Sequence, residues 1–138
     1  MLWGNDGALK LLLDAGADVN ACDKEGCTAL MHAVHYGNDG AIKMLIDEGA
    51  DVNARDKDGR TALVWAVRWG RLGAIKLLLD KGADVNARNK EGRTALMDAV
   101  RWGNDGAAKM LLDAKADVDA CDETRIVTKM LRENRDLS

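Results

Sequence analysis

The stretch Asp56–Arg88, DKDGRTALVWAVRWGRLGAIKLLLDKGADVNAR, decides the fold because the next 33 residues repeat it. Asn89–Cys121 matches it at 21 of 33 positions without a gap. Two residue series carry the same period along the chain: Gly4, Gly37, Gly70 and Gly103, and Asp18, Asp51, Asp84 and Asp117. Self-similarity at a fixed period of this length indicates a stacked repeat protein.

We divide the chain, residues 1–138, into a single domain of three whole repeats flanked by two halves. The whole repeats are 23–55, 56–88 and 89–121, with a half repeat, 1–22, before them. A weaker half repeat, 122–138, follows, and we expect it to act as a C-terminal cap. Because each repeat buries its apolar side chains against its neighbours, about three or more repeats are needed for a stable array.

Each repeat contains the signals of two short helices. In repeat 56–88, Thr61 is placed as the N-cap of the first helix, which is expected to end at Gly70 in a left-handed stop. The second helix is expected to span, for example, Asp39–Glu48, with an apolar stripe on one face. A glycine usually ends this second helix, but Lys115 stands at that position in repeat 89–121.

The sequence resembles the ankyrin repeat family in four features, which together cover nearly the whole chain. They are the 33-residue period, the T-A-L start, the glycine in mid-repeat and the G-A-D-V-N-A ending. The resemblance implies an all-α solenoid of stacked helix-turn-helix units with projecting β-hairpin or loop fingers. Family repeats usually begin T-P-L-H, whereas here Ala62 and Val64 replace the proline and the histidine. The hydrogen bonds of that histidine are therefore expected to be missing.

The resemblance also implies a non-catalytic protein–protein interaction module that binds through its finger tips and the concave face of its first helices. Carried over position by position, this surface includes nine basic side chains and four acidic ones: Lys24, Lys57, Lys90, Arg55, Arg60, Arg68, Arg88, Arg93 and Arg101, and Glu25, Asp58, Glu91 and Asp98. Its net charge is therefore +5, which leaves −8 for the remainder of a chain of net charge −3. We expect it to bind an acidic protein segment. The candidate residues are Tyr36, Arg55, Arg60, Trp65, Arg68, Trp69, Arg88, Arg93, Arg101 and Trp102.

Tryptophan and arginine are enriched where binding energy concentrates in interfaces, so the centre of the site is predicted at Trp65, Arg68, Trp69, Arg101 and Trp102. Trp65 stands where the neighbouring repeats have His32 and Asp98, which suggests that packing does not fix this position. An alternative interpretation is that Trp69 and Trp102 only shield a helix end and that the arginines are solvated charges.

A second candidate site has zinc-ligand residue types in one short stretch: Cys22, Cys27, His32 and His35. Its spacing, C-x4-C-x4-H-x2-H, differs from that of zinc fingers, which place about a dozen residues between the two pairs. It is therefore a weak metal candidate, and we expect no cofactor. No Ser/His/Asp arrangement, phosphate loop or H-E-x-x-H string occurs, so we expect no enzymatic activity.

The longest uninterrupted apolar run of the N-terminal segment, Leu11-Leu12-Leu13, is far too short to span a bilayer. Three cysteines do not suggest a disulfide framework. We expect a soluble, cytoplasmic protein with a protein partner. Nucleic acid is a weaker rival because Asp58, Glu91 and Asp98 interrupt the basic track. Two alternatives are a structural spacer within a larger ankyrin-repeat protein and an engineered, consensus-like scaffold. The uncapped N-terminal half repeat could also self-associate end to end.

Overall fold

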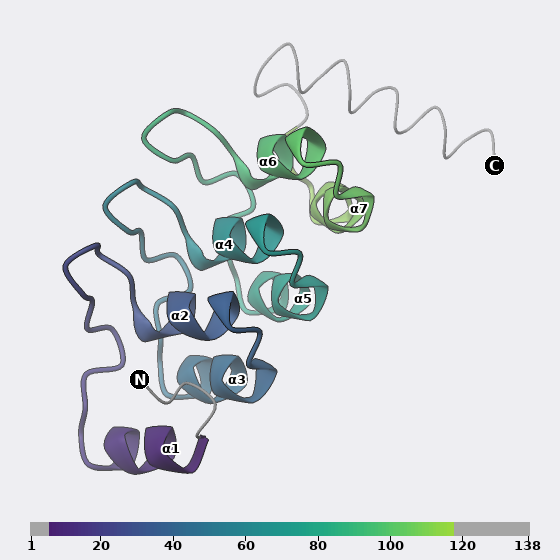
Figure 1. Cartoon of the computed structure of the whole chain (residues 1–138). Coiled ribbons are helices and arrows are strands. Elements are labelled where there is room, and N and C mark those ends of the chain that lie inside the picture. Colours follow the sequence, from purple (N-terminus) through teal and green to yellow (C-terminus); the bar gives the residue numbers. More distant parts are fainter. Residues whose placement is uncertain (1–5, 118–138) are drawn as a thin grey trace.

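The computed structural model describes residues 6–117, and seven helices form within this range (Figure 1). The helices are α1 (Asp6–Asp14), α2 (Ala29–His35), α3 (Asp39–Asp47), α4 (Ala62–Arg68), α5 (Leu72–Asp80), α6 (Ala95–Arg101) and α7 (Asp105–Asp113). They stack in two rows: α2, α4 and α6 form an inner row, and α1, α3, α5 and α7 form an outer row. The all-α fold expected from the sequence is confirmed.

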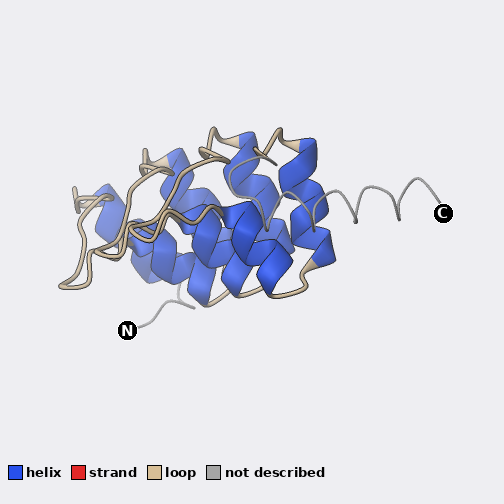
Figure 2. Ribbon diagram, turned by 90° about the horizontal axis from the view of Figure 1, so that it is seen from above, coloured by secondary structure: helices blue, strands red, loops and turns tan. Residues whose placement is uncertain are grey.

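The fingers are the long connections that run from each outer helix to the next inner helix, and they project from one side of the stack (Figure 1). Figure 2 draws them as loops, and within residues 6–117 the only strand-like pairing is an isolated antiparallel bridge between Cys22 and Thr28. Backbone hydrogen bonds join neighbouring fingers: Lys57 N–H donates to the Glu25 carbonyl at 2.9 Å, and Lys90 N–H donates to the Asp58 carbonyl at 3.0 Å. The fingers are therefore held as one surface.

The inner helices begin at the threonines that the sequence pattern selected. Thr61 Oγ1 accepts a hydrogen bond from Val64 N–H at 3.4 Å, and the equivalent threonines before α2 and α6 make the same bond. The side chain of Val64, which stands at the family's histidine position, is buried. Apolar packing therefore replaces the histidine hydrogen bonds at this helix start, while the threonine cap is retained.

The core lies between the two rows and consists of aliphatic side chains at equivalent positions of successive repeats. Fully buried leucines of the inner row meet fully buried leucines of the outer row: Leu30, Leu63 and Leu96 against Leu45, Leu78 and Leu111. Burial of each such side chain contributes about 1.5–3 kcal/mol relative to an exposed one. Since every layer depends on the next, the array folds as stacked neighbours rather than as separate units.

The left-handed turns that end the helices follow the glycine series. Gly70 has a φ of +66°, and its counterparts in the neighbouring repeats have almost the same value. Lys115 keeps this left-handed conformation, with a φ of +72°, although it is not a glycine. A non-glycine residue there costs about 1–2 kcal/mol, so the last described turn is strained.

The N-terminal half repeat forms one helix, α1, within its described residues. Leu9 and Leu13 pack against the core, whereas Leu11 and Leu12 are exposed. Leu12 is equivalent to the fully buried Leu45 of α3, which the inner helix α2 helps to cover, whereas α1 packs chiefly on α3. The expected C-terminal cap, 122–138, lies outside the described residues. Among the helices of residues 6–117, none is long and apolar enough to cross a membrane.

Candidate functional site

Each finger is anchored to its inner helix by a set of three side chains that we call the finger base. The sets are Asp23, Cys27 and His32; Asp56, Arg60 and Trp65; and Asn89, Arg93 and Asp98. Their members recur at intervals of 33 residues, so the three sets occupy equivalent places in the stack. Three of the candidate binding residues, Arg60, Trp65 and Arg93, belong to the finger bases.

The second finger base is organised by the buried carboxylate of Asp56. Its Oδ1 accepts hydrogen bonds from the backbone N–H groups of Asp58 and Arg60, both at 2.9 Å. Its Oδ2 accepts from Arg60 Nε at 3.1 Å and from Trp65 Nε1 at 3.2 Å. The Arg60 guanidinium also lies over the Trp65 ring, 5.2 Å from its centroid. One carboxylate therefore holds the finger turn, the arginine and the tryptophan together.

The other two finger bases keep the turn but change the side-chain contact. Asp23 Oδ2 lies 3.0 Å from His32 Nε2, and Arg93 Nε lies 3.2 Å from Asp98 Oδ1. The residue at the Trp65 position thus has a finger partner in every repeat. The interpretation that packing does not fix Trp65 is wrong, because the indole is half-buried against the core and its N–H donates to Asp56.

Aromatic side chains gather at the C-terminal ends of the inner helices. The His35 ring lies 4.6 Å from the Trp69 ring, 4.9 Å from the Tyr36 ring and 5.8 Å from the Trp65 ring, measured between centroids. Tyr36, Trp69 and Trp102 recur every 33 residues and are 60%, 50% and 62% exposed. These rings therefore form an accessible surface that crosses from one repeat to the next.

The predicted arginines divide into groups according to their contacts. Arg60 and Arg93 are paired with carboxylates inside the finger bases. Arg55 Nη1 donates to the Arg88 carbonyl at 2.8 Å, which links the second finger to the third. Arg68 and Arg101 are exposed, and within residues 6–117 the structure shows no hydrogen bond or ion pair for either. Neither guanidinium is therefore paired with a carboxylate of the described part of the chain.

We define the aromatic–arginine strip as the surface formed by seven residues: His35, Tyr36, Trp65, Arg68, Trp69, Arg101 and Trp102. The structure brings together His35, Tyr36, Trp65 and Trp69 through ring contacts, and Arg68 and Arg101 flank the exposed tryptophans in sequence. Arg55 and Arg88 lie on the fingers instead. Sequence reasoning placed His35 among metal ligands, and its ring contacts assign it to the aromatic surface.

Local contacts shift the pKa values of three groups on the first two fingers. The pKa of Asp23 is lowered, first by the Cys27 backbone N–H and then by the His32 side chain. The pKa of the Cys27 thiol is raised, chiefly by burial and further by the nearby carboxylates of Asp23 and Asp56. The ion pair with Glu25 raises the pKa of Lys57. The Cys27 thiol is therefore protonated at neutral pH.

The four predicted metal-ligand residues do not come together as a group. Cys27 and His32 do, and they are joined by Asp23: one ligand atom of each lies within 4.8 Å of the other two. Cys22 is exposed at the bridge to Thr28, outside this cluster. Sequence reasoning missed Asp23, although its recurrence as Asp56 and Asn89 at the start of each finger turn was a readable signal.

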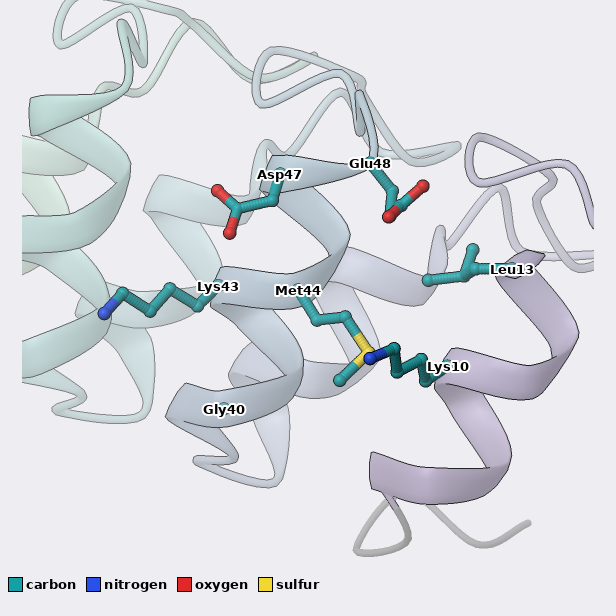
Figure 3. A pocket seen from close by; sticks show the side chains of 7 residues that line it. All are labelled: Lys10, Leu13, Gly40, Lys43, Met44, Asp47 and Glu48. Carbon is teal, nitrogen blue, oxygen red and sulfur yellow. The ribbon is translucent and has the colours of Figure 1, made fainter.

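A shallow hollow lies on the outer row between α1 and α3 (Figure 3). Its lining residues are Lys10, Leu13, Gly40, Lys43, Met44, Asp47 and Glu48. A second hollow lies at the equivalent position between α5 and α7. Its lining residues are Lys76, Leu79, Asp80, Met110, Asp113 and Ala114. Because it recurs with the repeat, this depression is a consequence of helix stacking and not a specialised site.

Comparison with known families agrees with this architecture. A family model described as ankyrin repeats (three copies) matches residues 1–89, and one described as a single ankyrin repeat matches residues 91–123. Neither of these models describes an enzyme family. A comparison with curated proteins found no match.

Proposed function

Because the chain belongs to the ankyrin repeat family, we propose that its aromatic–arginine strip binds an acidic segment of a partner protein. Ankyrin repeats are protein–protein interaction modules, so the coarse function follows from the family. The finer proposal concerns which face binds and what chemistry that face prefers.

The row of exposed aromatic side chains carries this proposal. Tyr36, Trp69 and Trp102 are each at least half exposed at the same position of three successive repeats. A large exposed aromatic surface is costly in a soluble protein and is typical of binding surfaces. Tryptophan and tyrosine are also the residues that most often dominate binding energy in interfaces.

Charge supports the choice of an acidic partner. Arg68 and Arg101 stand next to the exposed tryptophans, and the finger bases already satisfy Arg60 and Arg93. An arginine without a carboxylate partner can bind one in a bidentate geometry. A segment of alternating acidic and apolar residues would therefore satisfy both the arginines and the aromatic rings of the strip.

The test is a pair of charge-reversed proteins that differ only in the face that is changed. Arg68→Glu/Arg101→Glu alters the strip, and Lys43→Glu/Lys76→Glu alters exposed lysines of the outer row by the same total charge. Partners are captured from lysate with the unmodified chain, and affinities for the purified partner are then measured for both variants.

We expect the strip variant to bind at least about 100-fold more weakly, because two interfacial hot-spot arginines are changed and each contributes about 2 kcal/mol or more. The outer-row variant is expected to bind as the unmodified chain does. Equal loss in both variants would indicate a non-specific charge effect, and full retention in both would refute the proposed face. Failure to capture any specific partner would favour the structural spacer.

A further inference from the structure

The first finger base differs from the other two in chemistry, and we propose that Asp23, Cys27 and His32 bind a zinc ion. A carboxylate, a thiol and an imidazole are all zinc ligands, and one ligand atom of each lies within 4.8 Å of the other two. Zinc would then connect the first finger to helix α2. This inference is independent of the aromatic–arginine strip.

The distances suit a tetrahedral ion. With zinc–ligand bonds of about 2.0–2.3 Å, the nitrogen and oxygen ligands lie about 3.3 Å apart, and the sulfur and nitrogen ligands about 3.6 Å. His32 Nε2 and Asp23 Oδ2 are already 3.0 Å apart. Small side-chain rotations would therefore bring the Cys27 sulfur from within 4.8 Å to the required separation.

The backbone of the finger holds the ligands in place before any metal arrives. Asp23 Oδ1 accepts hydrogen bonds from Glu25 N–H at 2.9 Å and from Cys27 N–H at 3.0 Å, which directs Oδ2 towards His32. Asp23 N–H donates to the Cys27 carbonyl at 3.0 Å, so the two ligand-bearing residues are fixed to one another. Hydrogen bonds of this kind to a ligating carboxylate orient it and support metal affinity.

The equivalent finger bases show that this place in the repeat accommodates a cation. Arg60 Nε lies 3.1 Å from Asp56 Oδ2, and Arg93 Nε lies 3.2 Å from Asp98 Oδ1. In the first repeat Cys27 replaces the arginine, so the guanidinium is missing while the carboxylate is kept. A zinc ion bound by the Asp23 carboxylate and the Cys27 thiolate would restore the positive charge at this position.

Exposure is compatible with entry of the ion. Cys27 is buried, whereas the side chains of Asp23 and His32 are 45% and 31% exposed. The ion would therefore approach from solvent and keep a water molecule as its fourth ligand. Binding replaces the S–H bond of Cys27 by a zinc–sulfur bond, and the thiol proton is released to solvent.

The experiment uses Co²⁺ and Zn²⁺ salts as probes with the full chain carrying Cys22→Ser and Cys121→Ser, so that Cys27 is the remaining thiol. We expect a thiolate-to-cobalt charge-transfer band that zinc abolishes at one equivalent. Calorimetry in buffers of different ionisation enthalpy should report release of about one proton at neutral pH. His35→Ala serves as the control that leaves the ligands intact and should bind Co²⁺ and Zn²⁺ as tightly as its parent.

Cys27→Ser and His32→Gln should each remove the charge-transfer band or weaken zinc binding by more than about 100-fold. Circular dichroism verifies that each variant is folded, and His32→Gln provides the test if the change at buried Cys27 unfolds the chain. The proposal is overturned if the parent shows no charge-transfer band. It is also overturned if His32→Gln binds zinc as tightly as the parent.

Discussion

The buried carboxylate of Asp56 should be the most sensitive polar group of the fold, and Asp56→Asn isolates its role. The amide oxygen can keep the two backbone hydrogen bonds, as Asn89 Oδ1 does with the N–H groups of Glu91 and Arg93 at 2.9 and 3.0 Å. The amide nitrogen, however, would replace Oδ2 and face two donors, Arg60 Nε and Trp65 Nε1.

The expected cost follows from these two contacts. Each lost hydrogen bond to a charged acceptor contributes about 1.5 kcal/mol or more, so Asp56→Asn should lower the free energy of unfolding by about 3 kcal/mol. In a chain of this size that corresponds to a decrease in Tm of about 10 °C. Burial of the site prevents water from replacing the lost acceptor.

Denaturant unfolding followed by circular dichroism measures the effect, with Asp58→Asn as the matched control. Asp58 also pairs with Arg60, at 2.8 Å, but its side chain is 54% exposed. The control should therefore lose less than about 1 kcal/mol. If the two variants differ by less than about 0.5 kcal/mol, the role assigned to the buried carboxylate is refuted.

Three further outcomes are expected. Lys115→Gly should raise the free energy of unfolding by about 0.5–1 kcal/mol. The change removes left-handed strain of about 1–2 kcal/mol, and the added backbone entropy of the unfolded chain offsets part of this gain. An unchanged or lower free energy of unfolding would contradict this prediction. Gly59→Ala should destabilise the fold more than Gly49→Ala in denaturant unfolding. Both glycines have a positive φ, +78° and +93°, but a Cβ at Gly59 would lie 2.9 Å from a backbone nitrogen of the next finger, whereas no described residue lies within 4 Å of a Cβ at Gly49. With Cys121 replaced by serine, iodoacetamide should modify exposed Cys22 faster than Cys27 at pH 8, because burial hinders access and raises the pKa of the Cys27 thiol; equal rates by mass spectrometry would contradict it.

The helices could be predicted from the sequence because their boundaries depend on local signals. Thr61 caps the start of α4 and Gly70 allows the left-handed turn after its end, and each acts only on the turn of helix next to it. The expected Asp39–Glu48 helix differs from α3 only by its last residue. The 33-residue register then places each helix against its equivalent in the next repeat. Local signals and repetition together were sufficient for the fold.

The finger bases could not be predicted in the same way. The contact between Asp23 and His32 joins residues nine positions apart, and it exists because the finger folds back onto its inner helix. A count of charges likewise cannot show that Arg60 and Arg93 are satisfied internally while Arg68 remains available. Sequence reasoning therefore located the candidate surface but did not separate its anchoring residues from its accessible ones.

The indole N–H resonances of the tryptophans provide the most direct test of the proposed binding face. In a ¹⁵N–¹H spectrum recorded with and without the captured partner, the indole signals of Trp69 and Trp102 should shift or broaden. The indole of Trp65, whose N–H is hydrogen-bonded to Asp56, should change less. Unchanged signals of Trp69 and Trp102 in a saturated complex would contradict the central claim that the aromatic–arginine strip is the binding surface.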